Sequence, residues 1–296
     1  MFIRKRPVPN TILYTLLYII LLIAVPCHAA DVLIIADAQL KPVMDVTLGM
    51  RKTLHASTRI YSPTDVRGNL AAVLRREDAR VVIALGREAL AEALTLPASI
   101  PVIYDMVVTP PTVSRPNTVG FYMATPTREY AELVRNYLPV LKRVAVVASR
   151  SFLNILATDV TAPMSSHSVK NVVEFVGLVN RLESADAILL LPDSGVMTST
   201  AMHEVYLHSF RRSIPLLGIS EKNVREGALL ALVVDMVNVG KVIGEYAAVA
   251  LRSGSVGQQS ALPPRKFDLY LNMDTARKMR ISVPDEVVRM ARKAYP

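Results

Sequence analysis

The chain has 296 residues, of which 34 are Lys or Arg and 25 are Asp or Glu, and it contains one cysteine. With about 150 residues per domain as a guide, this length predicts two domains rather than one. The basic residues are scattered in short pairs at the ends of apolar runs, which indicates solvated helix ends and argues against binding of nucleic acid.

The first thirty residues have the layout of a secretory signal peptide. Basic residues from Arg4 to Arg6 precede an apolar segment from Thr11 to Val25, and small residues follow near position 29. We therefore predict a signal peptide over residues 1–29 that is removed on export. The mature protein then begins at Ala30 and works in the periplasm.

The single cysteine, Cys27, lies inside this predicted signal peptide. Its removal would exclude disulfides, a thiol nucleophile and cysteine-bound metal from the mature chain. Two alternatives to cleavage stay open. Cys27 could be acylated, although Pro26 is unfavourable before a lipidated cysteine. The apolar segment could also remain as an anchor, although it is shorter than the ~20 residues that span a bilayer.

After the signal, apolar runs of strand length alternate with amphipathic stretches of helix length. This alternation predicts βαβ units and a parallel sheet with helices on both faces. The runs are dense in Val, Ile and Leu, as strands buried on both faces require. In chain order we expect strands at 32–36, 59–61, 81–85 and 101–106, and helices at 43–54, 65–76 and 87–94.

A second, similar series begins at residues 119–123. Thr125 is placed to cap a helix with Pro126 at its first position, since apolar residues then recur on one helical face as far as Leu138. Gly254 is placed to end the last long helix. We expect further strands at 144–148, 187–191 and 215–219, a last apolar run at 228–234, and further helices at 198–210 and 237–251. A polar linker then leads to residues 267–272.

The two series predict an α/β protein of two Rossmann-like lobes with parallel sheets. We expect residues 30–119 and 237–262 to form the first lobe, and residues 120–236 and 263–296 to form the second. The chain should then cross between the lobes three times, near residues 119–122, 233–236 and 263–267, and these crossings would form a hinge.

Three stretches of the chain carry a recognisable pattern of motifs. The first joins Val119-Gly120-Phe121 to Leu138-Pro139 and to the strand from Lys142 to Val147. The second runs from Asp186 to Gly240, and the third from Leu271 to Pro284. In order and spacing these stretches resemble the ABC-transporter substrate-binding family, in the branch that includes tryptophan- and tyrosine-type receptors.

The resemblance implies the type I periplasmic-binding-protein fold and an exported protein of an uptake system. It implies a small ligand, such as an aromatic or branched amino acid, and an ABC permease of the inner membrane as partner. We expect the protein itself to be a monomer. The chain departs from the family between Ser149 and Asp186, where it is compressed and contains Pro163. This departure predicts a reduced edge of the second lobe.

Ligands of open parallel sheets bind beyond the carboxyl ends of the strands. An amino-acid ligand needs donors for its carboxylate, such as Ser149, Ser194, Arg87 or Arg150, and an acceptor for its ammonium group, such as Asp193 or Asp235. Residues of these types also cap helices in any protein. The ligand-binding candidates are Asp37, Gln39, Gly86, Arg87 and Asp105 in the first lobe, and Ser149, Arg150, Asp193, Ser194, Ser220, Glu221 and Asp235 in the second.

Motifs for enzymes are incomplete in this sequence. His203 and His208 are five residues apart, so on a helix they diverge by about 140° and do not form a zinc pair. The segment from Gly218 to Lys222 lacks the second glycine of a serine-hydrolase elbow. The sequence has neither a P-loop nor a dinucleotide fingerprint. We therefore predict a binding protein rather than an enzyme, with no cofactor and no metal.

Two other binding proteins share the expected two-lobed architecture. A sugar-repressor type of regulator would need a helix-turn-helix where this chain has its export signal. A periplasmic sensory receptor, which presents its ligand-bound form to a membrane signalling protein, is the alternative to a transport protein that the sequence leaves open.

Overall fold

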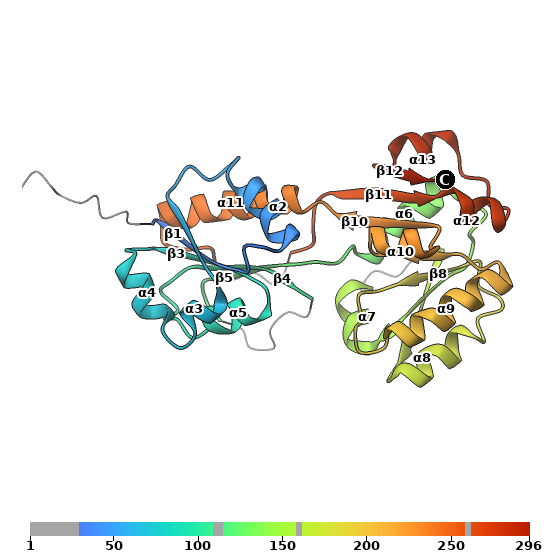
Figure 1. The fold of residues 1–296 in the computed structure, drawn as a ribbon, viewed down its shortest axis with the longest axis horizontal. Helices are drawn as coiled ribbons and strands as arrows, with labels where there is room; N and C mark the ends of the chain where they lie inside the picture. The colour runs from blue at the N-terminus through green and yellow to red at the C-terminus, as the bar shows by residue number, and fades with distance from the viewer. Residues whose placement is uncertain (1–29, 109–114, 158–161, 258–261) are drawn as a thin grey trace, which may run out of the picture.

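The computed structural model describes residues 30–108, 115–157, 162–257 and 262–296. The predicted signal peptide and Cys27 lie outside these described residues. Two lobes, each built around one β-sheet, lie side by side along the long axis of the molecule (Figure 1). Within the described part of the chain, no helix combines the length and the hydropathy needed to cross a membrane.

The first sheet has five strands in the order β2-β1-β3-β4-β5, and all neighbours are parallel. Every residue of β1 and β3 is buried, because helices cover both faces of the sheet. The strands are β1 (Val32–Ile35), β2 (Thr58–Tyr61), β3 (Val81–Leu85), β4 (Val102–Val107) and β5 (Thr118–Tyr122).

The helices of the first lobe form one layer on each face of this sheet. On one face lie α2 (Lys41–Met50) and α11 (Met236–Ser253), whose apolar residues pack with those of β1, β3 and β5. The other face packs on α3 (Pro63–Val66), α4 (Leu70–Arg76) and α5 (Arg87–Ala93).

The two long helices of the first lobe, α2 and α11, pack backbone against backbone. A Cβ atom on Gly240 would lie 2.0 Å from the carbonyl oxygen of Val46, and one on Gly49 would lie 2.1 Å from that of Val237. Only glycine fits at both positions. This contact joins α11, which lies in the chain between two strands of the second sheet, firmly to the first lobe.

The second sheet has seven strands in the order β12-β11-β10-β9-β8-β6-β7. Strand β11 runs antiparallel to β10, and the other neighbours are parallel. The strands are β6 (Val144–Ser149), β7 (Met164–Val169), β8 (Ala187–Leu190), β9 (Leu216–Gly218), β10 (Leu230–Val234), β11 (Phe267–Asn272) and β12 (Lys293–Tyr295).

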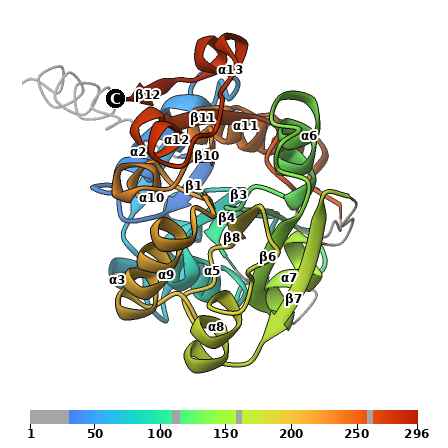
Figure 2. The ribbon, with the colours of Figure 1, turned by 90° about the vertical axis from the view of Figure 1, so that its right-hand side faces the viewer.

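Helices cover both faces of the second sheet as well. One face packs on α6 (Thr127–Tyr137), α7 (Arg150–Leu156), α12 (Met273–Lys278) and α13 (Asp285–Met290). The other face packs on α8 (Val172–Val179) and α9 (Ser199–Arg212), and α10 (Glu221–Glu226) follows β9. Figure 2 shows these layers along the long axis.

The same strand order occurs in both lobes. Strands β2-β1-β3-β4-β5 correspond in order to β7-β6-β8-β9-β10, so each lobe is a doubly wound unit whose order reverses beside its first strand. The predicted repetition of one α/β series is therefore confirmed. Each strand expected from the sequence is present, with its ends within two residues of the predicted ones.

The chain passes between the lobes three times, after β5, between β10 and α11, and ahead of β11. Hydrogen bonds join these crossings into one ribbon. The N–H of Leu262 donates to the carbonyl of Gly120 at 2.7 Å, and the N–H of Asp235 donates to that of Lys266 at 3.0 Å. The three-crossing fold expected from the sequence is confirmed, whereas the residue limits of the two lobes stay a prediction.

The structure differs from the sequence prediction at several places. The helix expected at 43–54 spans 41–50, and β11 is antiparallel in a sheet that was expected to be parallel. Thr125 does not cap α6, because its hydroxyl donates to the carbonyl of Leu232 at 2.8 Å. The helix expected at 65–76 is two helices, separated at Gly68, whose φ of 66° is left-handed. The edge near Pro163 is not reduced, since α7, β7 and α8 supply a helix, a strand and a second helix.

Candidate functional site

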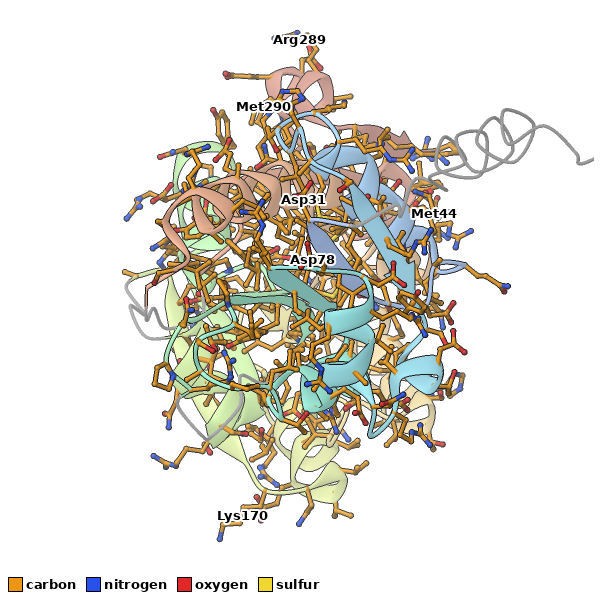
Figure 3. The ribbon with its side chains drawn as sticks, turned by 90° about the vertical axis from the view of Figure 1, so that its left-hand side faces the viewer. Asp31, Met44, Asp78, Lys170, Arg289 and Met290 are labelled. Carbon is orange, nitrogen blue, oxygen red and sulfur yellow. The ribbon has the colours of Figure 1, made fainter. Side chains whose placement is uncertain are left out.

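The carboxyl ends of the first sheet point toward the second lobe. Asp31 and Asp78, which precede β1 and β3, lie at the outer end of the first lobe, where Figure 3 looks straight at them. The opposite ends of these parallel strands therefore face inward. In the second lobe, α7 follows the carboxyl end of β6 and lies on the side that faces the first lobe (Figure 1).

Each lobe has one switch point, where the strand order reverses, and this is where ligands of doubly wound sheets bind. It lies between β1 and β3 in the first lobe and between β6 and β8 in the second. Many of the predicted residues follow these four strands: Asp37 and Gln39 after β1, Gly86 and Arg87 after β3, Ser149 and Arg150 at the end of β6, and Asp193 and Ser194 after β8.

At the switch point of the second lobe, one carboxylate ties the two loops together. The side chain of Asp193 accepts a hydrogen bond from the N–H of Ser149 at 2.8 Å and another from the N–H of Gly195 at 3.1 Å. Asp193 is buried, with 3% of its surface exposed. Its carboxylate holds the loop after β8 against the start of α7, while Ser194 beside it is exposed.

At the switch point of the first lobe, the polar groups are open to solvent. Asp37 and Gln39 are exposed, and the carboxylate of Asp37 accepts a hydrogen bond from the N–H of Gln39 at 3.1 Å. Gly86 precedes α5 with a φ of 104°, a conformation that favours glycine. The turn at Gly86 places Arg87 at the first position of the helix.

Two arginines stand in matching positions in the two lobes. Arg87 is the first residue of α5 after β3, and Arg150 is the first residue of α7 after β6. Both side chains are exposed, and neither forms an ion pair within the residues that the structure describes. Guanidinium groups pair with carboxylates in a bidentate geometry, so each switch point offers a donor for an anionic group.

Three other predicted residues have structural partners in the second lobe and at the hinge. Ser220 caps α10 by accepting from the N–H of Asn223 at 3.2 Å, and Asp235 caps α11 by accepting from the N–H of Asn238 at 3.0 Å. Glu221 accepts a hydrogen bond from the hydroxyl of Tyr295, which holds the pKa of that carboxyl below its usual value. These contacts stabilise helix ends and the attachment of β12.

Asp105 lies in the core of the first lobe, where a ligand does not reach it in this arrangement. It is in register with Leu85 inside β4, and 1% of its surface is exposed. One carboxylate oxygen has no hydrogen-bond partner, and the N–H of Met106 bonds to the carboxyl group. Burial raises the pKa of Asp105 to about 7. The backbone is unusual here too, since the β4–β5 register shifts after Tyr104 and Met106 has a φ of 61°.

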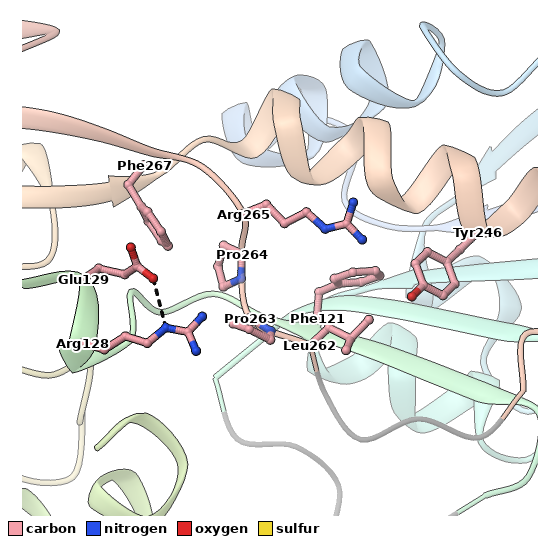
Figure 4. Close-up of a pocket in the computed structure, with 9 residues that line it drawn as sticks. All are labelled: Phe121, Arg128, Glu129, Tyr246, Leu262, Pro263, Pro264, Arg265 and Phe267. Carbon is pink, nitrogen blue, oxygen red and sulfur yellow. Dashed lines mark hydrogen bonds and ion pairs between the residues drawn. The ribbon is translucent and has the colours of Figure 1, made fainter. Parts of the chain in front are cut away.

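A pocket of about 340 Å³ lies beside the crossings, and none of the predicted ligand-binding residues lines it (Figure 4). We call it the hinge pocket. Its nine lining residues come from β5, α6, α11, β11 and the segment before β11: Phe121, Arg128, Glu129, Tyr246, Leu262, Pro263, Pro264, Arg265 and Phe267. No sequence motif predicts this pocket, because its residues are far apart in the chain.

Among the described residues, no group of three or more His, Asp or Glu side chains is placed to hold a metal ion. His203 lines a different pocket of about 490 Å³ between α9 and α10. His208 is largely buried in α9, and burial lowers its pKa.

Two doubly wound sheets, joined by three crossings with their carboxyl ends turned inward, define a two-lobed binding protein of the periplasmic type. Residues 62–295 match the family model described as ABC transporter substrate binding protein. The chain belongs to this family, as the resemblance predicted. The family consists of substrate-binding proteins rather than enzymes. Membership implies a small-molecule ligand, a membrane transporter as partner and a location outside the cytoplasm.

Solved structures share this fold at low sequence identity. The ligand-free, open structure of CD0873, a substrate-binding protein with adhesive properties from Clostridium difficile, has a TM-score of 0.66 and 15% identity, and the match covers 90% of this chain and 99% of that one. An ABC domain in complex with L-Trp from Streptococcus pneumoniae has a TM-score of 0.53 and 14% identity, covering 89% and 99%. Among curated proteins, no match is found.

Proposed function

We propose that this protein is exported to the periplasm, where it binds a small carboxylate-bearing solute between its lobes and delivers it to an ABC permease. The observation that carries the proposal is the pair of exposed arginines, Arg87 and Arg150, one at the switch point of each lobe. A solute that contacts both needs both lobes close to it, so its binding energy favours closure of the hinge.

An amino acid is the solute class that we favour. One structure of similar fold, the Streptococcus pneumoniae ABC domain, holds L-Trp. In our proposal the guanidinium groups of Arg87 and Arg150 bind the carboxylate, with Ser149, Ser194 and the backbone at Gly86 as further donors. Asp37 is an exposed acceptor for the ammonium group, with Gln39 beside it.

The other predicted ligand-binding residues do not contact the solute directly in this proposal, because they already have hydrogen-bond partners or are buried. Asp193 and Asp235, expected from the sequence to be acceptors, already accept backbone N–H groups, as does Ser220. We propose that Asp193 shapes the site by fixing the start of α7. Asp105 would reach a ligand only after rearrangement of β4, and Glu221 only after release from Tyr295.

The proposal predicts that protein purified from periplasm without denaturation retains its solute. Native mass spectrometry should show one added small molecule per chain, lost on unfolding. Since the chain has no tryptophan, L-tryptophan that replaces the solute can be followed by its indole fluorescence. A folded protein that carries no solute and binds none of the twenty amino acids would contradict the proposed ligand class. An N-terminus still at Met1 in membrane-held material would contradict export by a cleaved signal.

A further inference from the structure

The hinge pocket is separate from the site at the carboxyl ends of the strands. Its walls belong to different lobes: Phe121 and Tyr246 come from β5 and α11, whereas Arg128 and Phe267 come from α6 and β11. In Figure 4 the first two side chains gather on one side of the pocket and the other two on the opposite side. Pro263 and Pro264 lie between them, and Leu262 lies beside Phe121.

The floor of the hinge pocket is fixed by the hydrogen bonds that join the crossings. The N–H of Leu262 donates to Gly120, the N–H of Tyr122 donates to the carbonyl of Leu262 at 3.3 Å, and Lys266 accepts from Asp235. A rotation of the lobes about this ribbon moves the walls and leaves the floor in place. The shape of the pocket therefore depends on the angle between the lobes.

The pocket surface is more polar than apolar, and its apolar part includes aromatic rings. The rings of Phe121 and Tyr246 meet edge to face, with centroids 5.6 Å apart and planes at 79°. Phe267 lies on the opposite wall, and Leu262, Pro263 and Pro264 contribute the floor. A cavity of this volume suits a small molecule, and aromatic walls favour a planar one.

The charges of the hinge pocket leave one cation in excess. The guanidinium of Arg128 pairs with the carboxylate of Glu129 at 3.1 Å. Arg265 is exposed and forms no ion pair with any residue in the described ranges. The first turn of α6 carries Glu129 as well as Arg128, so the excess cation of the pocket is Arg265.

We propose that the hinge pocket is a second binding site, which takes a small planar monoanion such as an aromatic carboxylate. The ring of Tyr246, which packs on the buried ring of Phe121, contacts its apolar face, and the guanidinium of Arg265 pairs with its anionic group. A bound molecule touches both lobes and the crossings, so it stabilises the lobe arrangement seen here against rotation. By linkage it weakens binding of any solute that closes the lobes, and that solute weakens it equally.

Binding at the pocket is tested with 4-fluorobenzoate in a fluorine NMR titration of the full mature chain. We expect Arg265→Ala to weaken binding at least tenfold and Arg265→Lys to weaken it less. The matched control is Arg252→Ala, an exposed arginine in the last turn of α11 that does not line the pocket, and it should change binding less than twofold. The neutral 4-fluorobenzyl alcohol should bind at least tenfold more weakly than the anion. Circular dichroism checks that each variant is folded.

The coupling to lobe rotation rests on the proposed function and has its own measurement. Spin labels at Ala91→Cys in α5 and Asn154→Cys in α7 report the distance between the lobes, and both positions are exposed. Saturating 4-fluorobenzoate should leave the mean distance unchanged and narrow its distribution, and Arg265→Ala should abolish this effect. No binding of 4-fluorobenzoate, or equal binding by Arg265→Ala, would overturn the site. A shift to shorter distances would overturn the proposed coupling between the hinge pocket and lobe rotation. This holds whatever solute binds at the carboxyl ends of the strands.

Discussion

Replacing Arg87 and Arg150 together by alanine should weaken binding of the retained solute by at least a hundredfold. A hydrogen-bonded pair between charged groups contributes about 1.5–3 kcal/mol, so two such pairs contribute about 3 kcal/mol or more. At 1.4 kcal/mol for each factor of ten, this loss corresponds to about a hundredfold in dissociation constant. Calorimetric titration with the solute identified by mass spectrometry measures it.

The fold of this double variant should be unaffected. Both arginines are exposed and without ion pairs in the described residues, and such surface substitutions change stability by about 0.5 kcal/mol or less. The matched control is Arg211→Ala with Arg289→Ala, which removes the same charge from exposed arginines of α9 and α13. An equal loss of affinity in this control would mean that net charge alone attracts the solute. Unchanged affinity in Arg87→Ala with Arg150→Ala would mean that neither arginine contacts the solute.

Replacing Asp105 by asparagine should change how stability depends on pH. The pKa of this carboxyl is about 7 in the folded chain, against an ordinary value of 3.8 that we take for the unfolded chain. Below pH 3.8 both states hold the proton. Between these two values the unfolded state releases the proton while the folded state keeps it, so folding loses stability as pH rises. Above about pH 7 the loss is complete, at about 4 kcal/mol, because one pKa unit is about 1.4 kcal/mol.

Asparagine cannot ionise, so Asp105→Asn removes this pH-dependent loss. The free energy of unfolding of the variant, relative to the original chain, should rise by about 2–3 kcal/mol between pH 5 and pH 8. Urea unfolding at the two pH values measures the difference. Asp78→Asn is the control, because Asp78 is exposed and has a φ of 52°, which asparagine also tolerates. If the free energy of unfolding changes with pH in the same way for Asp105→Asn and for the original chain, the carboxyl of Asp105 is ionised in the folded protein.

Buried strands were the easiest part of the fold to predict from sequence. The run 81–85 is a continuous strand signal, and the structure places β3 on those same residues. Strand β7 gave no such signal, because it is an edge strand with mostly polar residues between Met164 and Val169. Gly68 was a visible sign that the helix at 65–76 is interrupted, since glycine often marks a left-handed position.

The sequence predicts where strands end, and therefore which residues lie near the candidate site. It does not predict which of these side chains are exposed and free of other hydrogen bonds. The sequence predicts Asp193 as an acceptor for the ligand, yet its carboxylate accepts a hydrogen bond from the N–H of Ser149, which is 44 residues away. Asp105 stands at a strand end in the sequence and is buried in the fold. The hinge pocket could not be predicted, because it combines residues from Phe121 to Phe267 that only the crossings bring together.

The distance between the lobes, with and without the retained solute, tests the central claim most directly. The mature chain labelled at Ala91→Cys and Asn154→Cys should show a broad distance distribution when the solute has been removed. Adding the solute should shift the distribution to shorter distances, and Arg87→Ala with Arg150→Ala should require a much higher concentration for the same shift. A distribution that stays unchanged while calorimetry shows full occupancy would contradict binding between closing lobes.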